Sequence, residues 1–112
     1  MNLISYTDFE KVDIRIGTIV EVRDFPQARK PAFQLFIDFG AEIGLKRSSS
    51  QITQHYSKES LLGKQVLAVV NFPEKQVGPF ISQVLTLGLA NETKGIALVS
   101  PDLKVPNGER LL

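Results

Sequence analysis

The sequence predicts a mainly β fold with only short helices. Apolar and polar residues alternate along much of the chain, and glycine, proline and asparagine divide it into short segments that are typical of strands. Segments that suit a helix are few and brief. The 112 residues, of which 43% are hydrophobic, suffice for one hydrophobic core, so we expect residues 1–112 to form a single domain.

A short helix and a long strand are expected first. Thr7 and Glu10 have the capping-box spacing, in which each side chain can bond the other residue's free N–H group, so a brief helix should open near Asp8. A strand should follow, in which Gly17 marks a bend. Its apolar residues share one parity: Val12, Ile14, Ile16, Val20 and Val22. Asp24-Phe25-Pro26 should end this strand.

Two more strands and a helical insert are predicted next. An alternating apolar run indicates the second strand, which Gly40 ends: Phe33, Leu35, Ile37 and Phe39. The third strand is expected from Ile43 to Ser48. After a helical turn between Gln51 and Tyr56, a short helix should occupy Ser57 to Leu62, with Ser57 as its cap and Gly63 as its stop.

The second half of the chain contains three more apolar runs. Val66–Val70 resembles a fully buried strand, Ile81–Leu89 a half-buried one, and Ile96–Val99 a short one that follows a polar turn at 91–93. Three strands, a helical insert and further strands are the order of a five-stranded oligonucleotide-binding (OB) barrel, mainly β with short helices and terminal extensions. An open sandwich has the same order of elements, so both architectures remain open.

The segment between the first two of these runs is predicted to be a recognition loop. Pro73 and Pro79 should exclude both helix and strand ladder from it. Its other residues include the exposed cation Lys75. Polar, proline-rich loops carry recognition more often than packing.

The composition argues against catalysis. The chain has no cysteine and His55 is its only histidine, so neither a thiolate nor a multi-histidine metal site can form. Three consecutive serines, 48–50, lie beside Lys46, but they are more simply hydrogen-bond donors to phosphate or turn formers than nucleophiles. Gly63-Lys64 lacks the following hydroxyl of a phosphate-binding loop. We predict no catalytic residue, no metal and no cofactor.

The N-terminal sequence predicts a cytoplasmic protein. It lacks a basic region followed by an apolar core and a cleavage site. No run approaches the roughly 18 apolar residues that span a membrane, so we expect no membrane insertion.

Charge is nearly balanced, at a formal +1, so any phosphate-binding surface must be local. Two basic pairs are candidates, Arg29-Lys30 and Lys46-Arg47, each at the edge of a predicted strand. The alternative is that both are ordinary solvated surface charge.

Four ordered motifs resemble the tRNA-binding-domain family over about Asp8 to Leu112, and especially a small stand-alone member described as an export-related chaperone. They are DFEKVDIRIGTIVEV, IGLKRSSSQIT, VVNFPEKQVGPFISQVLTLGL and PDLKVPNGERLL. The resemblance implies a five-stranded OB barrel whose terminal extensions form a homodimer.

The resemblance also implies a set of RNA-binding residues, to which the loop cation adds one more. They are Arg29, Lys30, Lys46, Arg47, Ser48, Ser49, Gln51, Lys75 and Ser82. After Ser82 the wider family commonly has glycine and methionine, where this chain has Gln83, Val84 and Leu85. We therefore expect recognition of RNA shape and backbone here rather than of bases.

Two functions follow from the resemblance, and they do not exclude each other: we expect an RNA-binding protein with export-related chaperone activity, and the alternative is a pure chaperone in which RNA binding is vestigial. One is a dimeric module that binds tRNA or another structured RNA. The other is a chaperone that holds unfolded or pre-export polypeptides, with the SecA export machinery as a further partner. Its apolar groove would use Phe33, Phe72, Phe80 or the terminal leucines, although phenylalanines at strand spacing are usually core.

Apolar residues at both ends of the chain are candidates for the dimer interface. They are Leu3, Ile4, Tyr6, Leu103, Val105, Leu111 and Leu112. The alternative is that the ends fold back on their own barrel. Residue types alone favour neither arrangement.

Overall fold

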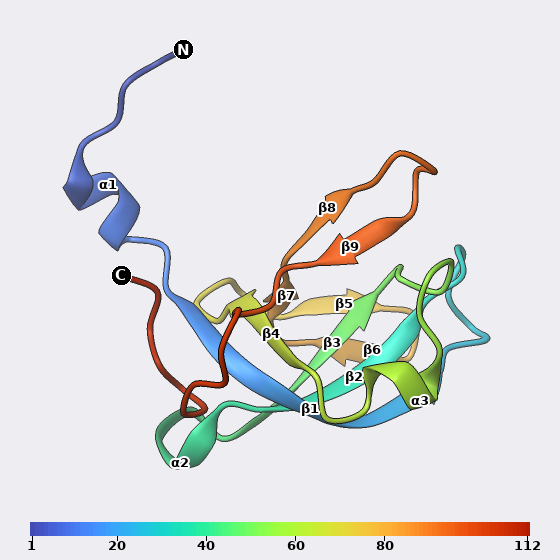
Figure 1. The fold of residues 1–112 in the computed structure, drawn as a ribbon. Coiled ribbons are helices and arrows are strands. Elements are labelled where there is room, and N and C mark those ends of the chain that lie inside the picture. The colour runs from blue at the N-terminus through green and yellow to red at the C-terminus, as the bar shows by residue number, and fades with distance from the viewer.

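The computed structural model describes residues 1–112 and contains a small antiparallel barrel (Figure 1). Five strands lie in the order β3-β2-β1-β4-β7. Their bounds are β1 (Ile14–Asp24), β2 (Phe33–Asp38), β3 (Leu45–Ser50), β4 (Gln65–Val69) and β7 (Leu85–Thr86). The N–H groups of Gln83 and Val84 donate to the Arg47 carbonyl, at 2.7 and 3.4 Å, and bring the two ends of the sheet together. This nearly closed barrel confirms the predicted OB architecture and rules out the open sandwich.

The remaining elements are short. They are α1 (Tyr6–Glu10), α2 (Gly40–Ile43), α3 (Lys58–Leu61), the β5 (Lys75–Val77) and β6 (Phe80–Ser82) hairpin, and the β8 (Gly88–Ala90) and β9 (Ile96–Leu98) hairpin. In Figure 1 the β8–β9 hairpin and α1 both extend away from the barrel. None of the helices is long and apolar enough to cross a membrane.

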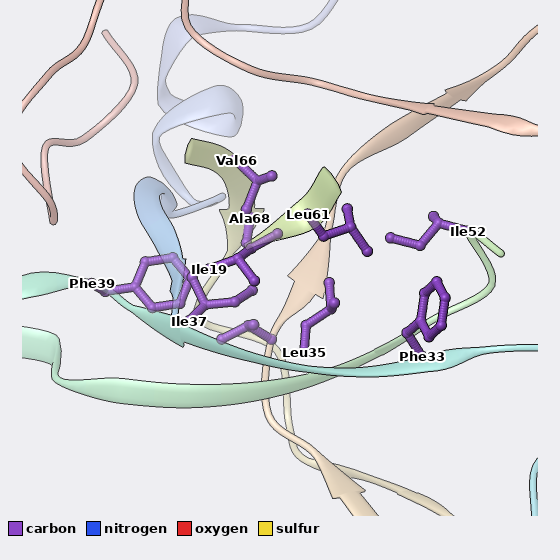
Figure 2. Close-up of a cluster of buried hydrophobic side chains, with 10 residues drawn as sticks. Ile19, Phe33, Leu35, Ile37, Phe39, Ile52, Leu61, Val66 and Ala68 are labelled. Carbon is purple, nitrogen blue, oxygen red and sulfur yellow. The ribbon is translucent and has the colours of Figure 1, made fainter. Parts of the chain in front are cut away.

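The core of the barrel joins inward-facing side chains of β1, β2 and β4 to α3 and the segment after β3. Figure 2 shows these side chains pointing toward one another. The alternation predicted for the second strand is confirmed, since its four apolar residues are all buried. The whole cluster consists of Ile19, Phe33, Leu35, Ile37, Phe39, Ile52, Leu61, Val66, Ala68 and Val84.

Strand β1 departs from the predicted parity. Its register to β2 shifts between Ile19 and Glu21, which is a β-bulge at Val20. Ile19 is therefore fully buried, whereas Val20, predicted to face the core, is 47% exposed. Sequence alternation alone does not reveal a bulge, because the extra residue is apparent only from the pairing with the other strand, where Val20 has no partner.

Gly17 permits close packing of β1 against β2. A Cβ atom added there would lie 2.5 Å from Ile37 Cγ2 and 2.8 Å from Phe39 Cδ1. Both neighbours are fully buried, so they have little space to move aside. The predicted bend at Gly17 is thus replaced by a close approach, and the strand irregularity lies three residues later.

The helix caps are partly as predicted. Ser57 caps α3, and Gly63, with φ of +85°, follows its end. The cap of α1 is Ser5 rather than Thr7: the Ser5 hydroxyl accepts from the Asp8 N–H at 3.1 Å, and the Asp8 carboxylate accepts from the Ser5 N–H at 3.2 Å. Ser5 and Asp8 have the same three-residue spacing as Thr7 and Glu10, so the sequence contains two overlapping capping-box patterns. The prediction of Thr7 as the cap was wrong.

Several strand boundaries also differ from the predictions. The segment Ile81–Leu89 is not one half-buried strand but parts of β6, β7 and β8, and β5 occupies the loop whose prolines were expected to exclude a ladder. Pro73 and Pro79 lie just outside β5, so they interrupt none of its hydrogen bonds. The third strand runs two residues later than predicted, after α2. Residues 53–55 form a turn, within the segment where a helical turn was predicted.

The C-terminal tail lies along the part of β1 that β2 leaves free, since β2 pairs with β1 only from Thr18 onward. Three backbone hydrogen bonds join them: Ile16 N–H to the Glu109 carbonyl, Gly108 N–H to the Ile16 carbonyl, and Leu111 N–H to the Ile14 carbonyl. The tail backbone thus folds back on its own barrel. Its side chains stay exposed at Leu103, Leu111 and Leu112, as do those of Leu3, Ile4 and Tyr6 at the other end.

Asp13 ties this tail to the barrel. Its carboxylate accepts a hydrogen bond from Arg15 Nε at 2.6 Å and pairs with Arg110 Nε at 3.5 Å. Arg15 also donates to the Gly108 carbonyl at 3.0 Å. The hydrogen bond to Asp13 raises the pKa of Arg15 above its ordinary value. Charge pairing therefore holds the two ends of the chain next to each other.

We predict that Gly17→Ala destabilises the barrel by about 1–3 kcal/mol, because the added methyl group collides with Ile37 and Phe39. Urea denaturation measures the loss. Val20→Thr is the control: it changes an exposed side chain of similar shape and should alter the free energy of unfolding by less than about 0.5 kcal/mol. An unchanged midpoint for Gly17→Ala would contradict the packing described.

Candidate nucleic-acid interface

An open hollow of about 1210 Å³ lies beside the barrel. Three segments line it: the loop between β1 and β2, the end of β3 with the residue after it, and the segment from Phe72 to Leu85. The recognition loop predicted from the sequence forms much of it. Six of the nine predicted RNA-binding residues line the hollow: Arg29, Lys30, Ser49, Gln51, Lys75 and Ser82.

The charge of the hollow has one sign. Its 17 lining residues include three cations, Arg29, Lys30 and Lys75, and no aspartate or glutamate. All three cations are exposed, and none takes part in an ion pair. Five other basic residues are paired with carboxylates: Lys11, Arg15, Arg23, Lys58 and Arg110. The free cations give the hollow a local positive potential that the near-zero net charge conceals.

A second small core holds the walls of the hollow together. Phe80 of β6 is buried against Phe25 and Ala32 from the β1–β2 loop, and the rings of Phe80 and Phe25 are 5.5 Å apart. Phe36 of β2 meets Phe80 edge-on at 6.3 Å. The β5–β6 hairpin is thereby packed on the outside of the barrel. Burial of the Phe80 ring stabilises a surface that otherwise consists of loops.

Hydrogen bonds from β3 fix the last residue of β6 and the residue after it. The Ser49 N–H donates to the Ser82 hydroxyl at 3.0 Å, and the Arg47 N–H donates to Gln83 Oε1 at 3.0 Å. Gln83 Nε2 in turn donates to Glu74 at 3.0 Å. Gln83, where the wider family commonly has glycine, therefore has a structural role. Its amide links β3 to the loop before β5 and positions Ser82 at the wall of the hollow.

Neither Lys46 nor Arg47 is among the residues that line the hollow. The two side chains lie on opposite faces of β3, because successive strand residues face opposite sides of a sheet. The Arg47 guanidinium stacks over the Phe80 ring, 5.2 Å from its centroid. Lys46 shares the parity of the buried Ser48 and Ser50. The structure therefore separates the two cations that the sequence places together.

Ser48 also departs from the expected RNA-binding set. Its side chain is only 1% exposed, so its hydroxyl is out of reach of a surface ligand. That hydroxyl accepts from Thr86 Oγ1 at 2.9 Å and lies 3.3 Å from the Ser50 hydroxyl. These contacts join β3 to β7 inside the barrel. Ser48 is thus part of the seam that closes the fold.

The three phenylalanines proposed for a peptide groove are not equivalent. Phe33 and Phe80 are buried in the two cores, which leaves neither ring available at the surface. Phe72 is 51% exposed and lines the hollow, as does Leu85, which is 50% exposed. The hollow thus combines an apolar part with its cationic part.

Of the glutamines that line the hollow, only Gln51 was among the predicted site residues. Gln27 and Gln76 line it together with Gln51 and Gln83, so four amides surround the space. Gln27 directly precedes Ala28-Arg29 in the same loop as the predicted cations, and that position is the only signal that could have marked it. His55 lies outside the hollow, and its Nε2 is 2.7 Å from the Thr93 hydroxyl at the turn of the β8–β9 hairpin. No group of three histidine or acidic side chains capable of holding a metal ion is present.

Comparison with known proteins identifies the class. A family model described as "Putative tRNA binding domain" matches residues 14–110, and the chain belongs to this family. The structure of the chaperone CsaA from Bacillus anthracis is similar at 45% identity and a TM-score of 0.92, over 99% of this chain and 100% of that one. The CsaA chaperone protein of Picrophilus torridus is similar at 50% identity and a TM-score of 0.91, over 98% of this chain and 100% of that one.

Longer proteins contain a similar segment. The methionine–tRNA ligase of Bacteroides fragilis is 35% identical over 108 residues, which is 96% of this chain. This chain spans only 16% of the length of that enzyme. The likeness therefore concerns one segment of the ligase.

We predict that Ser48→Ala lowers the free energy of unfolding by about 1–3 kcal/mol, because the buried Ser50 hydroxyl and the half-buried Thr86 hydroxyl lose a partner. Binding of tRNA by the folded variant should be unchanged. Ser49→Ala is the matched control, since its backbone bond to Ser82 remains and its side chain lines the hollow. Urea denaturation and a tRNA titration of both variants test this. Unchanged stability together with weaker tRNA binding for Ser48→Ala would contradict the assignment of Ser48 to the seam.

Proposed function

We propose that this protein binds tRNA or another structured RNA through the hollow. The observation that carries the proposal is a concave surface with three unpaired cations and no carboxylate, in a member of the tRNA-binding-domain family. Phosphate oxygens are the natural partners of such cations, and release of counterions makes their binding favourable. Most protein contacts to the nucleic-acid backbone position the ligand without reading its sequence. This protein therefore recognises RNA chiefly by the arrangement of its phosphates and 2′-hydroxyls.

Each cation has a distinct place in this proposal. Arg29 and Lys30 project from the β1–β2 loop, and Lys75 lies on β5, so phosphates can be held from two different segments. Ser49 and Ser82 supply hydroxyls nearby. Arg47, stacked on Phe80, contributes positive charge from outside the hollow and stabilises the β5–β6 hairpin. Lys46 is the cation of the predicted set with the least support, because it faces the side of β3 opposite to Ser49, which lines the hollow.

We also propose a homodimer formed by the chain ends. Tyr6 and Phe9 of α1 surround a hollow of about 180 Å³ together with Leu111 and Leu112. The apolar side chains here are exposed although the backbone of the tail is already paired with β1. Burial of such a patch against a second copy would remove it from water. A dimer would present two cationic hollows to one RNA.

A chaperone function is the second candidate. The two CsaA structures favour it, together with the exposed apolar side chains of Phe72 and Leu85 in the hollow. In this alternative the hollow holds apolar segments of unfolded or pre-export polypeptides. Contact with the SecA machinery stays a prediction from the resemblance, and a cytoplasmic location stays a prediction from the N-terminal sequence. We expect no catalytic activity in either case.

Salt dependence distinguishes the two candidates. Phosphate binding weakens as salt rises, whereas burial of apolar surface changes little. For Lys30→Ala we expect weaker tRNA binding and a salt slope smaller by roughly 0.7–0.9, the value of one lost phosphate contact. Fluorescence anisotropy with labelled tRNA at several salt concentrations measures both quantities.

Lys58→Ala is the control for this experiment. It removes the same charge from α3, outside the hollow, where Lys58 is paired with Asp24 at 2.8 Å, a hydrogen bond that raises its pKa. Affinity and slope should stay near those of the unmodified protein. If Lys30→Ala also leaves both unchanged in a folded protein, the hollow is not the RNA site. Salt-insensitive binding of an unfolded polypeptide would then favour the chaperone.

We predict that the protein is a dimer at micromolar concentration and that Leu111→Asp makes it monomeric. The added carboxylate would be buried without a partner in the proposed interface, whereas in the monomer this side chain is exposed. Light scattering coupled to size exclusion measures the mass. Leu62→Asp, at an exposed site after α3, should remain dimeric. A monomeric parent protein, or a dimeric Leu111→Asp variant, would refute the interface.

A further inference from the structure

We propose that the hollow accommodates a short run of unpaired nucleotides, so that the protein grips RNA where bases are splayed out rather than stacked in a helix. The inference rests on the proposed RNA binding and specifies what enters the site. Three features of the hollow support the inference: its positive charge, its exposed phenylalanine ring and its amide side chains that have no hydrogen-bond partner in the protein.

The first feature is size together with charge. The hollow measures about 1210 Å³, more than the roughly 300–1,000 Å³ that encloses a drug-sized ligand, so it has room for more than one nucleotide. Its cations come from two segments, Arg29 and Lys30 from one and Lys75 from the other. Charges at separate points suit a chain of phosphates. The absence of any carboxylate among the lining residues disfavours a cationic ligand.

The second feature is the Phe72 ring. It is half exposed, whereas Phe25, Phe33, Phe39 and Phe80 are buried. Leu85, opposite Val69 in the β4–β7 pairing, is exposed in the same hollow. Proteins that bind single-stranded nucleic acid combine such an apolar wall with free cations. The bases stack on the aromatic rings, and the phosphates contact the basic side chains. A base that stays in a double helix cannot reach the face of such a ring.

The third feature is a pair of amides without partners in the protein. Gln83 is bonded to Arg47 and Glu74, and Gln76 donates to the Gly78 carbonyl. The side chains of Gln27 and Gln51 make no hydrogen bond, and both are exposed at the hollow. An amide can donate and accept, so it can meet the edge of any base. The four glutamines therefore divide into two that build the wall and two that are free for a ligand.

An acidic peptide would also satisfy the cations, but the observations favour RNA. The chain belongs to the tRNA-binding-domain family, and an exposed ring beside cations matches the two parts of a nucleotide. The double-helical part of a structured RNA can still contact the cations from outside. The inference therefore predicts that single-stranded and folded RNA depend differently on Phe72.

Fluorescence anisotropy with three probes tests this: a labelled single-stranded RNA of about ten nucleotides, within the site size of an OB fold, a duplex of the same sequence, and tRNA. The parent protein should bind the single strand more tightly than the duplex. Phe72→Leu, which keeps an apolar side chain but removes the ring, should weaken single-strand binding by roughly 5- to 100-fold. Phe72→Tyr should retain the affinity, because its ring can still stack. Leu62→Ala is the control for loss of an exposed apolar side chain elsewhere.

The outcomes separate the inference from the function on which it rests. If no RNA probe binds, the proposed function fails and the inference fails with it. If tRNA binds in a Lys30-dependent way while Phe72→Leu binds the single strand like the parent, only the inference fails. Equal affinity for single strand and duplex would also overturn it. Displacement of the single strand by polyglutamate, with polyglutamate binding equally dependent on Phe72, would identify a peptide site instead.

Discussion

The rest of the structure depends on strand β1, which has to satisfy three partners along its 11 residues. Its first part pairs with β4 on one edge and with the C-terminal tail on the other, and its last part pairs with β2. The bulge at Val20 turns Ile19 into the core, while Gly17 leaves the space that Ile37 fills. A strand constrained in this way sets the curvature of the barrel and the place of both chain ends.

The β1–β2 loop and the β5–β6 hairpin meet through one ring, that of Phe80. Burial of this ring against Phe25 and Phe36 packs a hairpin with only three residues per strand onto the barrel, where it could not be stable alone. Arg47 covers the other side of the ring. A small apolar cluster thus holds a polar surface in a defined shape, which is the condition for binding a ligand without first ordering loops.

The distribution of charge explains how a nearly neutral protein can attract an anion. Some carboxylates neutralise cations elsewhere: Asp13 pairs with Arg15 and Arg110 at the chain ends, and Asp24 pairs with Lys58 beside α3. The nearest acidic group to the hollow that the hydrogen bonds show is Glu74, which is bonded to Gln83 and forms no ion pair with the cations that line the hollow. Local separation of charge, rather than net charge, therefore determines the character of the surface.

Much of the fold and part of the site follow from local sequence. The alternation over residues 33–39, the Ser57 cap and the order of the elements are properties of neighbouring residues, so the sequence by itself determined them, as it did the presence of cations in the β1–β2 loop. Only the tertiary structure decided the bulge at Val20, the burial of Ser48 beneath Thr86 and the separation of Arg47 from the hollow. Periodicity reports which side chains share a face of a strand, but which face is covered depends on segments that are distant in sequence and pack against it.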